Sequence, residues 1–115
     1  SADAYYNRGN SFMSLKQYQA ALADFNKAIA LNSNASEYYN NRGFAYVQLG
    51  LQRQAIDNFN KAVRLNPNLA DAYNNRGCAF FIQGEIASSC ADMKKACELG
   101  MCQTLKKAND HGYCR

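Results

Sequence analysis

Five cysteines are the residues with the widest chemical repertoire in this chain of 115 residues, and all of them lie at or beyond position 78. They are Cys78, Cys90, Cys97, Cys102 and Cys114. No C-x-x-C motif occurs among them, so neither a thioredoxin-like redox site nor a c-type haem attachment is indicated. Three interpretations stay open: disulfides, reduced thiols packed as small apolar side chains, and a zinc site.

The disulfide interpretation depends on how the end of the chain folds back. A C-terminal cap helix that runs antiparallel to a helix over 86–99 would bring the last cysteines close to the earlier ones. The expected pairs are Cys97–Cys102 and Cys90–Cys114, with Cys78 left free. We favour this interpretation because disulfides between the clustered cysteines would hold in place a helix end that would otherwise fray. Disulfides persist in oxidising compartments, so an extracytoplasmic (periplasmic) location is favoured over a cytoplasmic one.

Metal binding and catalysis are the other chemistries that these residues could serve. A zinc site would combine three thiolates with the single histidine in a tetrahedral set. Its candidate ligands are Cys97, Cys102, His111 and Cys114. Their spacing matches no zinc motif, so we expect no metal and no cofactor. No Ser-His-Asp set, phosphate-binding loop or inward-facing carboxylate pair is found, and we predict that the chain is not an enzyme.

Composition limits the kind of partner. The net charge of +4 is scattered along the chain, whereas a nucleic-acid surface needs a clustered basic face, so no nucleic-acid partner is expected. No apolar run approaches the ~20 residues of a membrane span, so no membrane span is expected either. Hydrophobic residues make up 48% of the chain and charged ones 19%, a balance that predicts a folded domain rather than disorder.

An internal repeat supplies the elements that must position these side chains. The tripeptide Asn-Arg-Gly occurs three times at a spacing of 34 residues. The copies are Asn7-Arg8-Gly9, Asn41-Arg42-Gly43 and Asn75-Arg76-Gly77. Apolar residues at three- and four-residue spacing predict two helices in each unit, and no period-two alternation indicates a strand. Gly50 and Gly84 suit the turns between paired helices, and Pro67 ends the second unit.

The second unit resembles the tetratricopeptide repeat (TPR), a helix–turn–helix of 34 residues. Its matching residues are Tyr39, Gly43, Tyr46, Gly50, Ala55, Phe59, Ala62, Leu65 and Pro67. The third unit departs most, with Ser89, Cys90 and Cys97 where small or aliphatic residues stand in the others. The cysteine-rich ending resembles endings of bacterial TPR proteins.

The resemblance implies an all-α fold, a right-handed TPR superhelix (α-solenoid). We expect a single domain over 1–115. Its parts are repeat 1 over 2–35, repeat 2 over 36–69, repeat 3 over 70–103 and a cap helix over 104–115.

The resemblance also implies that the first helix of each repeat lines a concave groove where extended peptides bind. The candidate groove residues are Asn7, Asn10, Met13, Asn40, Asn41, Phe44, Val47, Gln48, Asn74, Asn75, Cys78, Phe81 and Ile82. An Asn amide both donates and accepts, so it can pair with a peptide unit. The equivalent Asn7, Asn41 and Asn75 resemble the asparagine ladder in the TPR region of O-linked N-acetylglucosamine transferase, which grips peptide backbones. The alternative is that these amides hold helices together or are solvated.

A second resemblance predicts what the groove does not bind. TPR cochaperones hold the acidic tails of heat-shock proteins with two Asn, two Lys and one Arg. Asn10 and Asn41 occupy the two asparagine positions, but Tyr6, Asp71 and Asn75 stand where the cations belong. A terminal carboxylate would lose its hydration there without gaining a charged partner, so an acidic chaperone tail is disfavoured.

Two sets of charged residues recur with the repeat. Asp3, Glu37 and Asp71 begin the first helices, where acids stabilise the helix dipole; if they also meet a ligand, the ligand is neutral or basic. The three arginines of the repeated tripeptide are expected to form structural ion pairs rather than an anion site. The expected pairs join Arg8, Arg42 and Arg76 to Asp24, Asp57 and Asp92.

The predicted function is a protein–protein interaction module, or scaffold, that binds an extended peptide or partner segment in the concave groove. The alternative is a structural protein that forms homo-oligomers through its uncapped first helix pair.

Overall fold

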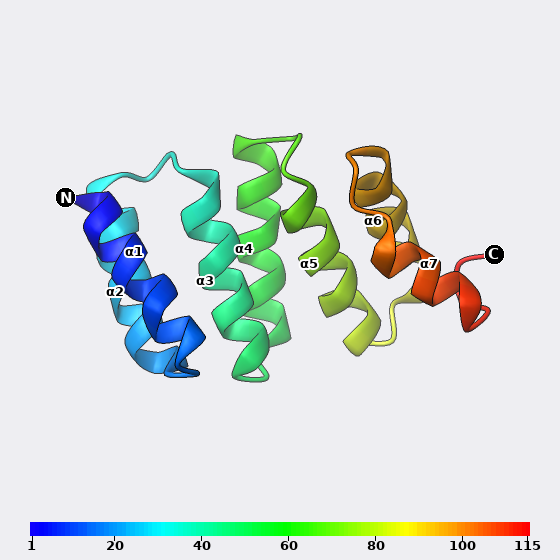
Figure 1. The fold of residues 1–115 in the computed structure, drawn as a ribbon, viewed down its shortest axis with the longest axis horizontal. Coiled ribbons are helices and arrows are strands. Elements are labelled where there is room, and N and C mark those ends of the chain that lie inside the picture. Colours follow the sequence, from blue (N-terminus) through cyan, green and yellow to red (C-terminus); the bar gives the residue numbers. More distant parts are fainter.

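A computed structural model describes residues 1–115 as seven α-helices without a strand (Figure 1). The helices are α1 (Ala2–Ser14), α2 (Tyr18–Leu31), α3 (Ser36–Gln48), α4 (Gln52–Leu65), α5 (Ala70–Ile82), α6 (Ile86–Glu98) and α7 (Gln103–Asp110). They follow one another along the longest axis of a molecule that measures 44 × 25 × 21 Å (Figure 1). The predicted all-α solenoid is confirmed. No helix has the length and apolar character that crossing a membrane requires.

Helices pack in pairs, and the pairs stack. Within a repeat α1 packs on α2, α3 on α4 and α5 on α6, while α2 contacts α3 and α4 contacts α5 between repeats. The first helices also touch, α1 with α3 and α3 with α5. They therefore present one continuous surface, which we call the first-helix face (α1, α3 and α5).

A glycine lets the two helices of a pair approach closely. A Cβ added at Gly9 or Gly43 would lie 2.6 Å from the ring of Phe25 or Phe59, both of which are fully buried. The third repeat uses a different contact, because Met93 replaces the phenylalanine. There the buried Ser89 hydroxyl donates a hydrogen bond of 2.7 Å to the Gly77 carbonyl oxygen.

The turn inside each helix pair requires a left-handed residue at the same position of the repeat. Gly50 and Gly84 adopt it with φ of 77° and 80°. Lys16 fills the equivalent place in the first repeat with φ of 59°, a conformation that costs an L-residue about 1–2 kcal/mol. The turn geometry is thus set by the packing of the pair and not by glycine alone.

The cap is shorter than the sequence pattern indicates. Helix α7 ends at Asp110, whereas we expected a cap helix over 104–115. Gly112 ends it with φ of 84°, and the last residues then return to α6. Ala108 and Cys114 are buried there against Cys90 and Met93. The end of the solenoid is therefore covered by one short helix and a tail.

Candidate functional site

Four asparagine side chains form a continuous hydrogen-bonded row across the first-helix face. The Nδ2 of Asn75 donates to Asn40 Oδ1 (3.1 Å), and the Nδ2 of Asn40 donates to Asn41 Oδ1 (3.4 Å). The Nδ2 of Asn41 in turn donates to Asn10 Oδ1 (2.7 Å) and to the Tyr6 hydroxyl oxygen (3.0 Å). We call Asn10, Asn40, Asn41 and Asn75 the amide row. It links α1, α3 and α5 and runs along the solenoid.

The amide row leaves part of its capacity unused. Asn40 is buried between helices, whereas Asn10, Asn41 and Asn75 are half-buried. The Oδ1 of Asn75 accepts no hydrogen bond within the protein, and the neighbouring Asn74 Oδ1 is buried without a partner. The unused acceptor of the half-buried Asn75 therefore lies on α5, where it could receive an N–H group of a ligand backbone.

Asn7 does not join the amide row, although it occupies the same repeat position as Asn41 and Asn75. Those two amides bond backward to the preceding repeat. Asn7 is in the first repeat, has no such neighbour and is exposed. Asn41 and Asn75 also choose different partners, because Phe44 stands in the second repeat where Asn10 stands in the first.

A tyrosine–aspartate contact at the start of the first-helix face escaped sequence analysis. The Tyr38 hydroxyl donates a hydrogen bond to the Asp3 carboxylate, which together with burial raises the pKa of Tyr38 to about 12. The Tyr6 ring lies 4.7 Å from the Tyr38 ring. The signal in the sequence is that Tyr38 replaces the alanines of the other repeats, Ala4 and Ala72. Asp3 is therefore engaged within the protein.

The expected arginine pairs form in two repeats and differ in the third. Arg8 binds Asp24 with two hydrogen bonds of 2.8 and 2.7 Å, and Arg76 binds Asp92 in the same way. The predicted partner of Arg42, Asp57, is wrong. The correct partner lies 16 residues after the arginine in every repeat, and in the second repeat that residue is Asn58, which accepts at 2.7 Å.

The Arg8–Asp24 pair predicts a pH-dependent stability. The Arg8 guanidinium holds the pKa of Asp24 below its ordinary value, so the pair stabilises the fold at neutral pH and stops doing so as the pH falls through that lowered pKa. Asp24→Asn should lower the urea midpoint at pH 7 and have a smaller effect at the lowest pH at which the domain stays folded, because the stabilisation is lost as Asp24 becomes protonated. The exposed Asp57→Asn is the control. An equal effect of Asp24→Asn at both pH values would contradict the ion-pair interpretation.

The apolar groove candidates divide between open surface and a pocket. Phe44 and Gln48 are exposed, and Val47 packs partly against α4. The C-terminal part of α5 instead faces α7 across a pocket of about 400 Å³, which we call the cap pocket. It is lined by Cys78, Phe81, Ile82, Met93, Thr104, Lys107, Ala108, His111 and Tyr113. Sequence analysis identified the residues on α5 but missed those on α7 and the tail.

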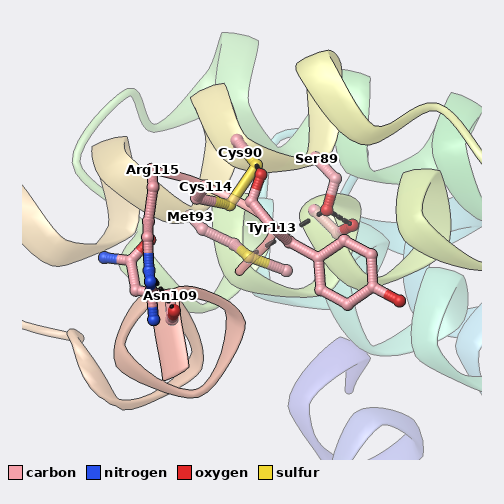
Figure 2. The surroundings of a disulfide bond; sticks show 8 residues. Ser89, Cys90, Met93, Asn109, Tyr113, Cys114 and Arg115 are labelled. Carbon is pink, nitrogen blue, oxygen red and sulfur yellow. Dashed lines mark hydrogen bonds between the residues drawn. A yellow bond between two sulfur atoms is a disulfide. The ribbon is translucent and has the colours of Figure 1, made fainter. Parts of the chain in front are cut away.

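Two disulfides hold the end of the chain. Cys90 is bonded to Cys114 with 5.4 Å between their Cα atoms, and Cys97 is bonded to Cys102 with 4.0 Å. Figure 2 shows the first of these bonds beside Met93 and Tyr113. Cys78 is the free cysteine, and burial raises the pKa of its thiol. The three cysteines of the candidate zinc set, Cys97, Cys102 and Cys114, are all in disulfides, and no three His, Cys, Asp or Glu side chains are grouped to hold a metal ion.

The repeat architecture matches a family of known proteins. A tetratricopeptide repeat model matches residues 2–35 and 36–69, and a second model of the same repeat matches residues 58–91. The chain belongs to the tetratricopeptide repeat family. The bacterial character of its ending stays a prediction. No curated protein matches this TPR domain.

Several solved TPR structures are similar to this TPR domain. The Arabidopsis OM64 TPR domain is 28% identical with a TM-score of 0.93, covering 96% of this chain and 93% of its own. The first TPR of Spaghetti (RPAP3), bound to the HSP90 peptide SRMEEVD, is 24% identical with a TM-score of 0.88, covering 96% and 91%. MamA is 31% identical with a TM-score of 0.81. The match covers 95% of this TPR domain and 61% of the MamA chain.

Proposed function

We propose that this TPR domain is a protein-interaction module that binds an extended peptide segment along the first-helix face. The observation that carries the proposal is the amide row, which crosses all three repeats. An extended backbone presents N–H and C=O groups at each residue, about 3.3 Å apart, and Asn side chains pair with both. Phe44 and Val47 supply apolar surface next to the row for alternate side chains of the segment.

Charge at the helix starts favours a neutral or basic segment at that edge of the face. Glu37 and Asp71 are exposed in the first turns of α3 and α5. Tyr6 and Asn75 stand where a clamp for acidic tails would need cations. The RPAP3 structure holds the acidic HSP90 peptide SRMEEVD. This TPR domain lacks the cations for a terminal carboxylate, so we expect it not to hold the carboxyl end of such a tail.

The amide row can be tested with peptides selected from a phage-displayed random library on the immobilised domain. Asn75→Ala removes the unused acceptor, and each lost neutral hydrogen bond should cost about 0.5–1.5 kcal/mol. The double variant Asn41→Ala, Asn75→Ala should therefore bind the selected peptides about tenfold more weakly by calorimetry. Because Asn41 also bonds to Asn10 and Tyr6, its loss should lower the melting temperature as well.

Asn68→Ala is the control, since Asn68 is an exposed asparagine in the turn between α4 and α5, outside the first-helix face. It should leave peptide affinity unchanged. The proposed function would be wrong if the library yields no binding peptide. It would also be wrong if the double variant, shown to be folded by circular dichroism, binds as the wild type does.

Self-assembly through the end face of α1 and α2 stays the alternative prediction. It requires a concentration-dependent oligomer in sedimentation that a change at Tyr5 or Tyr18 abolishes. Arg8 and Lys27 lie over the Tyr5 ring, at 5.8 and 5.3 Å from its centre, so part of that face is covered by the domain's own cations.

A further inference from the structure

We infer that the cap pocket binds one large apolar side chain of the partner segment and that Lys107 pairs with an acidic side chain two residues further along. The inference rests on the proposed function and specifies the sequence that this domain prefers. The segment would read apolar-x-acidic, where x is any residue. The shape of the pocket, its charge and its position on α5 near Asn75 favour such a segment.

The pocket has an apolar interior that an entering apolar side chain would fill. Met93 and Ala108 are buried at its base. The rings of Phe81 and Tyr113 meet edge to face, with 4.9 Å between their centres, and form one wall. Ile82 is 58% exposed, an unusual state for a large aliphatic side chain that lines a pocket. A volume of about 400 Å³ accommodates one large side chain, and covering Ile82 would add favourable apolar burial.

The charge of the pocket is positive on one side only. Lys107 on α7 and His111 at the C-cap of this helix lie one turn apart, and Lys107 has no ion-pair partner. The Nδ1–H of His111 donates to the Lys107 carbonyl oxygen at 2.9 Å, which leaves Nε2 for a ligand. No Asp or Glu lines the pocket; Asp110 borders a separate hollow on α7. A carboxylate is therefore the complementary group for this edge.

The cap pocket lies further along α5 from Asn75, the residue at which the amide row ends. Asn75 and Ile82 are seven residues apart on one helix, which corresponds to about 10 Å. About three residues of an extended chain span that distance. Side chains two residues apart in such a chain point to the same side, about 7 Å from each other. One of them can enter the pocket while the other reaches Lys107.

Cys78 provides a reporter of occupancy that the chain already contains. It is the one free cysteine, it lines the pocket, and its buried thiol has a raised pKa, so it should react slowly with alkylating reagents. A side chain in the pocket would cover it further. A bound peptide is therefore expected to slow alkylation of Cys78 in the oxidised wild-type domain.

The test compares peptides selected from the random phage library on three oxidised proteins: the wild type, Lys107→Glu and Lys106→Glu. Wild type should enrich apolar-x-acidic peptides that protect Cys78. Lys107→Glu should bind these peptides about tenfold or more weakly and should select Lys or Arg at the acidic position. Lys106→Glu, the adjacent residue outside the pocket, should select the same peptides as wild type. A selected peptide with Gln in place of its acid, measured against wild type, supplies the same comparison without a protein variant.

The outcomes separate the two proposals. Failure to select any peptide would overturn the proposed function. Peptides that bind wild type without an apolar-x-acidic pattern, or without protecting Cys78, would leave the proposed function standing and overturn the role of the cap pocket. Equal binding of the acidic peptide and its Gln counterpart would overturn the role of Lys107.

Discussion

Replacing both cysteines of the Cys90–Cys114 bond with alanine should lower the free energy of unfolding by about 3–4 kcal/mol. The bond closes a loop of 24 residues, and the cost of closing such a loop in the unfolded chain leads to this magnitude. It also ties the tail to α6, where Cys90, Met93, Ala108 and Cys114 form one buried cluster. Urea unfolding of the oxidised proteins, followed by circular dichroism, measures the difference.

The other disulfide is the matched control. Cys97 and Cys102 close a loop of only 5 residues, so their joint replacement with alanine should cost about 2 kcal/mol. The reduced wild type should fall at or below the less stable of the two variants. Thiol titration of the oxidised, unfolded wild type should find one free thiol, that of Cys78. Five free thiols in protein from an oxidising compartment would show that neither disulfide forms, and would contradict both predicted losses of stability.

Gly43→Leu should destabilise the central repeat by about 3 kcal/mol or more. A Cβ at this position already comes within 2.6 Å of the Phe59 ring, which is fully buried and cannot turn aside. The rest of a leucine side chain would force α3 and α4 apart, at the upper end of the usual overpacking penalty. The loss should appear as a lower midpoint in thermal and urea unfolding.

Two further variants show whether the ring causes this effect. Gly77→Ala should be milder than Gly43→Ala, because the nearest atoms to its added Cβ lie at 3.2 Å and not at 2.6 Å. Shortening the ring with Phe59→Leu should make Gly43→Ala less harmful than it is in the wild type. If Gly43→Ala costs the same in both backgrounds, the close helix contact is not the source of the penalty.

The architecture could be predicted because one local pattern repeats. Each Asn-Arg-Gly copy begins the same helix pair, so an uncertain element in one repeat is corrected by its equivalents in the others. The same logic explains the failure at Arg42. Asp57 offers the expected charge, but it stands one residue away from the position that the repeat dictates. Asn58 occupies the position that faces Arg42.

The candidate site was harder to predict because its contacts cross between elements. Whether an asparagine such as Asn7 or Asn75 joins the amide row depends on the repeat before it, and no property of the residue itself differs. The cap pocket depends on where a short, irregular end of the chain settles against α5. That placement follows from the tail and its bond to Cys90, for which the repeat has no counterpart.

The Cys90–Cys114 bond also determines how this domain carries mechanical load. A force applied at Arg115 passes after one residue through the bond into α6, so α7 lies outside the line of tension (Figure 2). Helix α7 would not be peeled from the end of the solenoid, and the segment between the two cysteines, whose sequence separation is 24, could not extend. The fully stretched chain would be shorter by about 80 Å than its reduced form. Tension applied at the C-terminal residue would therefore load α6, in the third repeat, before it reached α7.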